Sequence, residues 1–224
     1  GEKVTTVIPV DEDQGGNLVM ATKNGLIKKT ALSEFRNLRA SGLIAVTLRE
    51  DDELIGVTLT DGSRELLLGT RQGMSIRFSE DDVRLMGRAA QGVRSIDLGD
   101  GDEVVAMSAV QEGCEVLTIS ENGYGKRTSE REYRLQSRGG KGIKAMQLTD
   151  KTGPLVALML VRAEEDVMLI SDDGTIIRMA VADISTQSRS TQGVRLMRLA
   201  DSSRVVAVTT TEKIEETDEE ASAD

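Results

Sequence analysis

Aromatic residues, histidine and cysteine are scarce in this sequence, and each shortage excludes a class of structure or chemistry. Only 2% of the 224 residues are aromatic and none is Trp, so the core must consist of Val, Leu, Ile and Met. Histidine is absent and Cys114 is the single cysteine, which excludes most metal sites, Ser-His and Cys-His catalysis and a disulfide framework. Cys114 opens the run Cys-Glu-Val-Leu at 114–117, so we interpret it as a small, partly buried strand residue rather than a reactive thiol.

The sequence also lacks a long apolar run and a signal peptide. No stretch approaches the ~20 apolar residues of a membrane span, and a lone cysteine is typical of a reducing cytosol, so we expect a cytoplasmic protein without a membrane partner. The sequence does not begin with Met, and residues 2–7 already resemble a strand. We therefore interpret the chain as part of a longer protein. We expect no cofactor.

The formal charge of -10 is concentrated at one end. Residues 212–224 include seven acidic residues and one lysine, net -6, and few apolar side chains. We expect this segment to be a disordered acidic tail. Two hypotheses remain open for it: it keeps the protein soluble, or its carboxylates occupy a basic surface of the chain and compete with another polyanion for that surface.

A repeat of about fifty residues organises the chain. A turn glycine recurs at intervals of 48, 50 and 51 residues, in the pairs Asn24-Gly25, Gln72-Gly73, Asn122-Gly123 and Asp173-Gly174. Each pair follows an apolar run, which predicts a hairpin with a type I′ turn. Every unit continues with a second glycine and closes on an apolar strand; these glycines are Gly42, Gly92, Gly142 and Gly193.

Four short strands in each unit predict an all-β, propeller-like fold of four four-stranded blades. The repeats cover approximately residues 12–62, 63–112, 113–163 and 164–211, and residues 1–10 resemble the closing strand of a preceding blade. The S-x-x-E pattern at Ser129 predicts one helical turn between the two glycines. A β-sandwich is the alternative, but it does not need this period.

Cations recur at fixed positions of the repeat. Four residues after the turn glycine are Lys29, Arg77, Arg127 and Arg178, and the preceding position is Lys28 in the first unit and Lys126 in the third. Two residues after the second glycine are Arg94, Lys144 and Arg195; four before it are Arg88, Arg138 and Arg189, with Arg39 one place later in the shorter first unit. Equivalent positions lie on the same edge of every blade, which predicts a basic arc that binds the phosphates of duplex DNA. The alternative is that these cations keep edge strands soluble.

The loop Gln136–Gly142 combines charge with three glycines. Gly139, Gly140 and Gly142 let the backbone approach a phosphate closely, while Arg138 and Lys141 supply positive charge. The loop is not a P-loop, because that motif requires Gly at position 135 and Ser or Thr at position 142. A glycine-rich hairpin loop with incidental charge is the alternative.

The same loop resembles the gyrase A box, Q-R-R-G-G-K-G, which marks the family of the C-terminal domain of the DNA gyrase A protein. Six of seven positions agree, and Ser137 stands where the family usually has Arg. Residues 21–25, 52–57 and 122–128 are similar to the same family, and the resemblance covers nearly the whole chain. It implies a β-pinwheel whose blades exchange strands and whose basic perimeter wraps duplex DNA to support ATP-dependent negative supercoiling. The box would be Gln136, Arg138, Gly139, Gly140, Lys141 and Gly142.

The resemblance also implies partner proteins and places the catalytic residues outside this chain. The rest of the gyrase A protein, with the catalytic tyrosine, and the gyrase B protein would complete a heterotetramer in the bacterial cytoplasm near the nucleoid, and this chain would not be an enzyme on its own. Tyr124 and Tyr133 occupy repeat positions shared with other residue types, so neither is a candidate nucleophile. The family commonly has six repeats with the box in the first, so we interpret these four as the last four. The alternatives are the equivalent domain of topoisomerase IV and a protein-interaction β-propeller.

Overall fold

The computed structural model describes residue 4 and residues 6–10, 15–36 and 41–213, and these form a structure built of β-strands. Each repeat contributes one hairpin: β1 (Asn17–Thr22) with β2 (Leu26–Ala31), β4 (Glu65–Thr70) with β5 (Met74–Ser79), β8 (Glu115–Ser120) with β9 (Tyr124–Ser129), and β12 (Glu165–Ser171) with β13 (Ile176–Ala180). A short 3-10 turn follows each hairpin: η1 (Leu32–Phe35), η2 (Glu80–Asp82), η3 (Glu130–Glu132) and η4 (Val181–Asp183). The Ser129 hydroxyl accepts a hydrogen bond from the Arg131 amide in η3, which confirms the predicted turn.

The remaining strands connect each hairpin to its surroundings. The closing strands pair with the first hairpin strand of their own repeat: β3 (Leu54–Thr60), β7 (Val104–Ala109), β11 (Leu155–Val161) and β15 (Val205–Glu212). Three two-residue strands pair with the preceding repeat instead: β6 (Val93–Arg94) with β2, β10 (Ile143–Lys144) with β5, and β14 (Val194–Arg195) with β9. The strand exchange that the resemblance implied is therefore present at all three junctions between blades.

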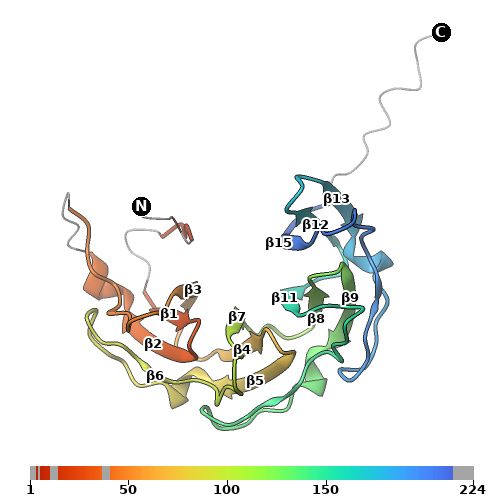
Figure 1. Cartoon of the computed structure of the whole chain (residues 1–224). Coiled ribbons are helices and arrows are strands. Elements are labelled where there is room, and N and C mark those ends of the chain that lie inside the picture. Colours follow the sequence, from red (N-terminus) through yellow and green to blue (C-terminus); the bar gives the residue numbers. More distant parts are fainter. Residues whose placement is uncertain (1–3, 5, 11–14, 37–40, 214–224) are drawn as a thin grey trace.

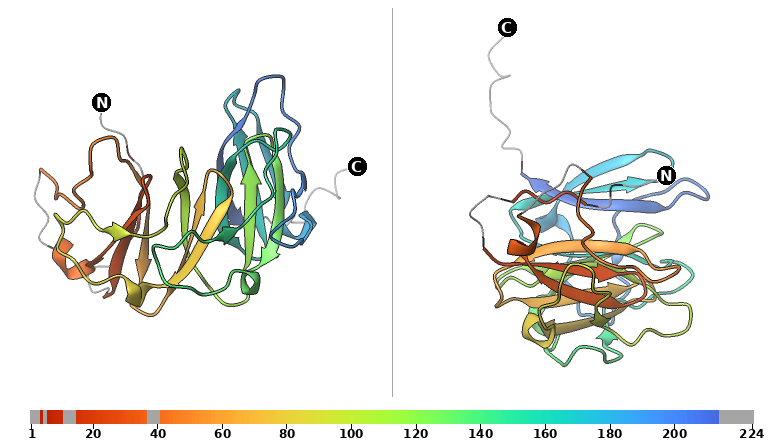
Figure 2. Two further views of the ribbon diagram at one scale, coloured as in Figure 1. Left: turned by 60° about the horizontal axis from the view of Figure 1, so that its bottom comes forward. Right: turned by 90° about the vertical axis from the view of Figure 1, so that its left-hand side faces the viewer.

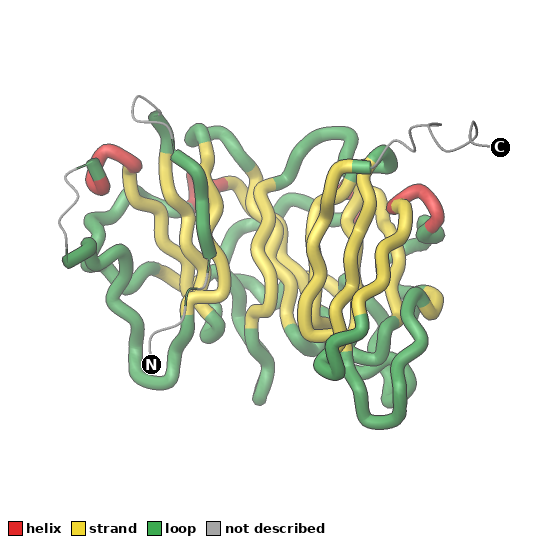
Figure 3. Tube along the Cα trace, turned by 90° about the horizontal axis from the view of Figure 1, so that it is seen from above, coloured by secondary structure: helices red, strands yellow, loops and turns green. Residues whose placement is uncertain are grey.

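The four sheets stand side by side in an open arc (Figure 1). Strands β3, β7, β11 and β15 lie on its concave side, while β2, β5 and β9 and the exchanged strands lie on its convex side. Figure 2 shows the same arc from two further directions, and Figure 3 shows the helical turns at the ends of the strands. A gap separates the first sheet from the fourth, so the described blades do not close into a ring.

The all-β, propeller-like prediction is confirmed, with one difference in strand number. The first three sheets have four strands each, but the fourth, β13-β12-β15, has three. A fourth strand on β13 would come from a following repeat, and the described residues contain no repeat after this one. Residues 6–10 form no strand, so their assignment to a preceding blade stays a prediction. Most of the predicted acidic tail, residues 214–224, lies outside the described residues.

The hairpin turns differ in type from the prediction. The Gly25 amide donates to the Thr22 carbonyl oxygen at 3.0 Å, so the glycine is the fourth residue of the turn. Gly25 has a φ of +78°, whereas neither central residue, Lys23 or Asn24, has a positive φ. A type I′ turn needs positive φ at both central residues, so the predicted type is wrong. The turn has the type I form, with its glycine in the left-handed region.

The apolar cores lie between blades rather than within single blades. One cluster packs Val19 and Ile27 of the first hairpin against Leu66, Leu68 and Phe78 of the second, and two further clusters join the second to the third blade and the third to the fourth. Burial of these side chains is the main stabilising contribution to each junction. Cys114 is 3% exposed, so it is buried as interpreted, but it lies one residue before β8 rather than in a strand.

Candidate nucleic-acid interface

The cations four residues after the turn glycine lie at the junctions between blades. Lys29 Nζ donates to the Glu80 carbonyl oxygen at 2.7 Å, and Arg127 Nε donates to that of Ile184 at 2.7 Å. Arg77 Nη1 donates to the Glu130 carbonyl oxygen at 2.7 Å. In each case the acceptor belongs to the 3-10 turn of the next repeat or the residue after it. These three side chains, which we name the junction cations, are between 8% and 17% exposed and hold neighbouring blades together.

The same repeat position in the last described blade has no following blade to contact. Arg178 instead forms an ion pair with Asp166 at 2.8 Å and donates to the Glu212 carbonyl oxygen at 2.8 Å. Its side chain is 32% exposed, about twice as much as the most exposed junction cation. The role of this position therefore depends on the presence of a neighbour.

Lys28 and Lys126 are fully buried, so neither can reach a phosphate in this structure. Lys126 Nζ donates to the carbonyl oxygens of Ser188 and Arg189 at 2.6 and 2.5 Å. Lys28 Nζ donates to those of Ala45 and Arg88. Burial, together with a nearby arginine, lowers the pKa of each lysine to about 8. Both ammonium groups thus fix the loop that the next repeat places beside them.

The arginines four residues before the second glycine lie in these loops. Arg138 donates to the carbonyl oxygens of Asp82 and Arg94 at 2.8 and 2.9 Å, and Arg189 donates to that of Lys144 at 2.6 Å. Arg88 is half-buried at the equivalent position, and Arg39 lies outside the described residues. Arg138 and Arg189 therefore use some of their N–H donors in hydrogen bonds to the preceding blade, so fewer donors remain for a ligand.

The box-like loop lies against the second blade. The Gly139 amide donates to the Ser95 carbonyl oxygen at 2.6 Å, and Gly140 accepts from the Asp97 amide at 2.9 Å. Gly142 has a φ of +73°, and a Cβ there would overlap the Ser75 carbonyl oxygen. The loop glycines thus permit close contact between two backbones. The backbone N–H of Gln136 donates to the Arg77 carbonyl oxygen. The Lys141 residue, in contrast, is exposed.

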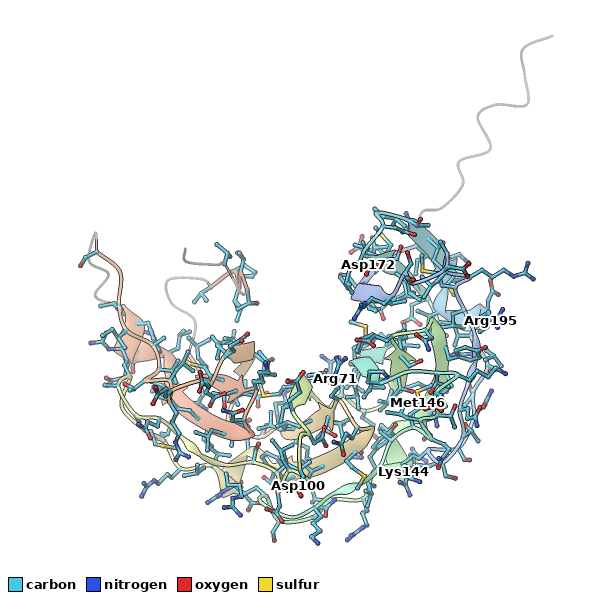
Figure 4. All side chains as sticks on the ribbon, in the orientation of Figure 1. Arg71, Asp100, Lys144, Met146, Asp172 and Arg195 are labelled. Carbon is cyan, nitrogen blue, oxygen red and sulfur yellow. The ribbon has the colours of Figure 1, made fainter. Side chains whose placement is uncertain are left out.

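Arg94, Lys144 and Arg195 lie on the convex side of the arc, and we name them the rim cations. Each occupies the second residue of an exchanged strand, and each is exposed. Figure 4 shows Lys144 and Arg195 on the outer side, whereas Arg71 and Asp172 lie on the inner side. Arg94 forms an ion pair with Asp97 at 3.3 Å, and Lys144 donates to the Gln147 side chain at 2.7 Å. The row of rim cations follows the curve of the arc from blade to blade.

Two further exposed arginines, which the sequence did not predict, lie beside the outer hairpin strands. Arg84 and Arg134 are exposed, and each precedes a leucine that bridges to the outer hairpin strand of the preceding repeat, Leu85 to Lys29 and Leu135 to Arg77. A signal was available, because both arginines stand eight residues before the second glycine of their repeats. The fourth repeat has Ser185 at this position, so the pattern is incomplete.

The arrangement of exposed cations suits binding of a polyanion. In the described part of the chain, no group of three or more acidic or cysteine side chains could hold a metal ion. The exposed guanidinium and ammonium groups are donors at regular intervals along a curve, which can neutralise phosphates. Of the helices within the described ranges, none has the length and apolar character needed to cross a membrane.

Comparison with known proteins places this geometry in a family. The family model described as "DNA gyrase C-terminal domain, beta-propeller" matches residues 16–61, 64–111, 115–162 and 165–212. The chain is 60% identical over 208 residues to the DNA gyrase A protein of Halalkalibacterium halodurans, 53% identical over 211 residues to that of Streptococcus pneumoniae, and 43% identical over 208 residues to that of Salmonella typhimurium. These alignments cover 92%, 93% and 92% of this chain and 25%, 26% and 24% of the relatives, so the chain spans about a quarter of their length.

Solved structures agree with the sequence comparisons. The C-terminal domain of a DNA topoisomerase IV matches with a TM-score of 0.86 at 26% identity, covering 92% of this chain and 65% of that one. A DNA gyrase A C-terminal domain matches with a TM-score of 0.82 at 25% identity, covering 89% and 67%. On these matches, this chain belongs to the family of the DNA gyrase C-terminal domain, a β-propeller.

Proposed function

We propose that this chain binds duplex DNA by its phosphates along the convex side of the arc and bends the DNA around it. The observation that supports this most strongly is the row of rim cations, which are exposed at the same position of three exchanged strands. A curved row of cations stabilises a bent duplex because each phosphate it neutralises releases counterions. Phosphate contacts read no base sequence, so the binding is weakly sequence-selective.

The chain then acts as the DNA-wrapping domain of a gyrase A protein. The rest of that protein and the gyrase B protein supply the catalytic tyrosine and ATP hydrolysis, and the complete heterotetramer introduces negative supercoils in the bacterial cytoplasm. Support comes from three relatives that are DNA gyrase A proteins, of which this chain matches about a quarter. The chain alone is a binding module rather than an enzyme.

The equivalent domain of topoisomerase IV is the second candidate. Its support is the TM-score of 0.86 to a topoisomerase IV C-terminal domain, slightly above the 0.82 for gyrase A. The 60% identity to a gyrase A protein and the Arg-Gly-Gly-Lys-Gly sequence from Arg138 favour gyrase. A protein-interaction propeller is disfavoured, because an uncharged, apolar or acidic binding face is expected there, whereas the convex side presents a row of cations.

The test is duplex binding across a salt series, with two single-charge variants. Lys144→Gln removes an ammonium group from the convex side. Lys23→Gln removes one at the repeat position of Arg71 and Asp172, which lie on the concave side (Figure 4). Each phosphate contact contributes about 0.9 to the slope of log K against log salt. Lys144→Gln should lower the slope by about this amount, and Lys23→Gln should leave it unchanged.

A topology assay then separates wrapping from simple binding. Nicked circular DNA that is ligated with the bound wild-type chain should change its linking number, and Lys144→Gln with Arg195→Gln should weaken that change. Equal slopes for Lys144→Gln, Lys23→Gln and the wild type would refute the convex surface. Tight binding without any change in linking number would refute wrapping.

A further inference from the structure

The three junctions between blades differ in charge at equivalent positions. Two of the positions are the second and fifth residues after the second glycine of the later repeat. The third lies in the earlier repeat, in the loop before its closing strand, three residues after Leu48, Leu98 or Leu148. They are Arg94, Asp97 and Asp51 at the first junction, Lys144, Gln147 and Gly101 at the second, and Arg195, Arg198 and Lys151 at the third. The net charges of these sets are -1, +1 and +3. Positive charge therefore accumulates at the junction of the third and fourth blades.

At this third junction a tyrosine hydroxyl holds the rim arginine. Arg195 pairs with Tyr124 across β14 and β9, and its Nε and Nη2 donate to the Tyr124 hydroxyl at 3.2 and 2.9 Å. The corresponding partners at the other junctions are Leu26 and Met74, which cannot accept such hydrogen bonds. The Tyr124 residue is only 6% exposed, so its ring is fixed by packing. The guanidinium is thus directed by a fixed acceptor, with its Nη1 not used in these bonds.

Lys151 approaches the same ring from the loop of the third repeat. Its Nζ lies 5.3 Å from the centre of the Tyr124 ring, and the carbon Cζ of Arg195 lies 5.5 Å from it. The Asn122 side chain donates to the carbonyl oxygens of Asp150 and Lys151 at 3.3 and 3.1 Å, which fixes the loop beside the hairpin. Two cations from different repeats therefore converge on one aromatic side chain.

The two cations and Arg198 line an open hollow of about 670 Å³. Its lining also includes Glu121 and Asp201, the only carboxylates there among the described residues, and Arg204. Glu121 forms an ion pair with Arg71 at 2.6 Å, and Arg204 forms one with Asp172 at 3.4 Å. Within the described ranges, no carboxylate forms an ion pair with Lys151, Arg195 or Arg198. The hollow therefore has an excess of positive charge and room for an anion.

We propose that this hollow is a discrete phosphate-binding site, in which Lys151, Arg195 and Arg198 bind the oxygens of one phosphate group and Tyr124 orients Arg195. Guanidinium groups match phosphate geometry, and an ammonium adds a compact charge. The site adds detail to the proposed function. Only the identification of the bound group as a backbone phosphate of duplex DNA rests on that proposed function. A free phosphate offers the same chemistry, so the experiment uses both.

Tyr124 gives the site its own reporter, because the protein has only two tyrosines and no tryptophan. Hydrogen bonding from Arg195 and the charges of Arg195 and Lys151 lower the pKa of the Tyr124 phenol. An anion that binds both cations weakens this effect and changes the electronic environment of the phenol. Tyr133 is 1% exposed in the core and serves as an internal control.

The experiment is carbon NMR of the 224-residue chain with its tyrosine Cζ atoms labelled, at neutral pH. The Tyr124→Phe variant assigns the two resonances. Inorganic phosphate is titrated at constant ionic strength maintained with chloride, and a short duplex is added in a second series. We expect a saturable shift of the Tyr124 resonance with either ligand and no shift of Tyr133. Lys151→Gln with Arg198→Gln should weaken phosphate binding about 10-fold for each lost cation, the equivalent of a typical charged hydrogen bond.

Arg84→Gln with Arg94→Gln removes the same charge near the first junction and should leave the response of Tyr124 to phosphate intact. A response without saturation, or one that the Lys151 and Arg198 variant retains, would overturn the site. Duplex binding with no Tyr124 response to either ligand would overturn the site and spare the proposed function. A saturable response to phosphate with no duplex binding would do the reverse.

Discussion

The junction cations give a sharp prediction, because the last described blade contains a natural control. Arg127→Gln removes hydrogen bonds to the carbonyl oxygens of Ile184 and Ala182 and an ion pair with Glu115 at 2.6 Å. Arg178→Gln removes the same charge at the same repeat position, where the described residues place no following blade. Both substitutions replace the same side chain with the same shorter, uncharged amide. The pair therefore separates contact between blades from charge as such.

The expected magnitudes follow from burial and partners. The Arg127 side chain is 12% exposed, and a hydrogen bond to a charged group contributes ~1.5–3 kcal/mol, so its loss should cost about 2–4 kcal/mol of unfolding free energy. Arg178 is 32% exposed, and a surface ion pair contributes less than about 1 kcal/mol. We expect Arg127→Gln to destabilise the protein clearly and Arg178→Gln to have little effect.

Urea denaturation followed by circular dichroism measures both values, and amide hydrogen exchange shows where stability is lost. In repeat structures the stability is largely a sum over neighbouring units, so Arg127→Gln should increase exchange mainly in the fourth blade. The salt slope of duplex binding should not change for Arg127→Gln. Equal destabilisation by the two variants, or a slope lowered by about 0.9 in a fully stable Arg127→Gln protein, would refute the assignment to the junction.

Two further predictions concern the loops that cross between blades. Lys126→Met leaves two carbonyl oxygens without their donor and should cost about 1–3 kcal/mol near pH 7. Its folded pKa of about 8 lies below the ordinary 10.5, so between these values the folded state binds fewer protons and gains stability as pH rises. The difference between wild type and variant in urea titrations should therefore widen from pH 8 to 10, and a narrowing would contradict this reasoning. Gly142→Ala should destabilise by more than about 3 kcal/mol, whereas Gly42→Ala, with a similar φ of +76° but open space, should cost about 1 kcal/mol. Thermal melts that show equal losses would argue against the close contact at Gly142.

The periodic features of the fold were predictable from the sequence because they depend on local residues. The turn glycine, the apolar runs around it and the Ser129 cap lie within a few residues of the structures they specify. The turn type was not predictable from the Asn24-Gly25 pair, since the hairpin places only the glycine at positive φ. The number of strands in the fourth sheet depends on whether another repeat supplies an exchanged strand. The residues of β13 carry no signal for the presence of such a repeat.

The burial of the basic side chains was much harder to predict from the sequence. Lys28 and Lys29 are neighbours in β2 and would face opposite sides of an isolated hairpin, yet both are buried. The segments that cover them, around Glu80 and Arg88, come from the next repeat, about fifty residues later. One local signal existed, because Arg77 follows Glu65 by twelve residues and pairs with it across the hairpin. Arg127 and Glu115 repeat this spacing, which indicates an internal partner.

The same residue types thus serve two roles that the curvature of the arc connects. Junction cations hold each blade on the next, and rim cations lie on the exchanged strands that cross the same junctions. A duplex that follows the rim must pass over every junction, so the distance between its phosphate contacts is set by how rigidly the blades are joined. Loosening a junction would then weaken DNA bending even where every rim cation remains. By this reasoning Arg127→Gln should preserve the number of phosphate contacts and reduce the change in linking number, a combination that removal of a rim cation cannot produce.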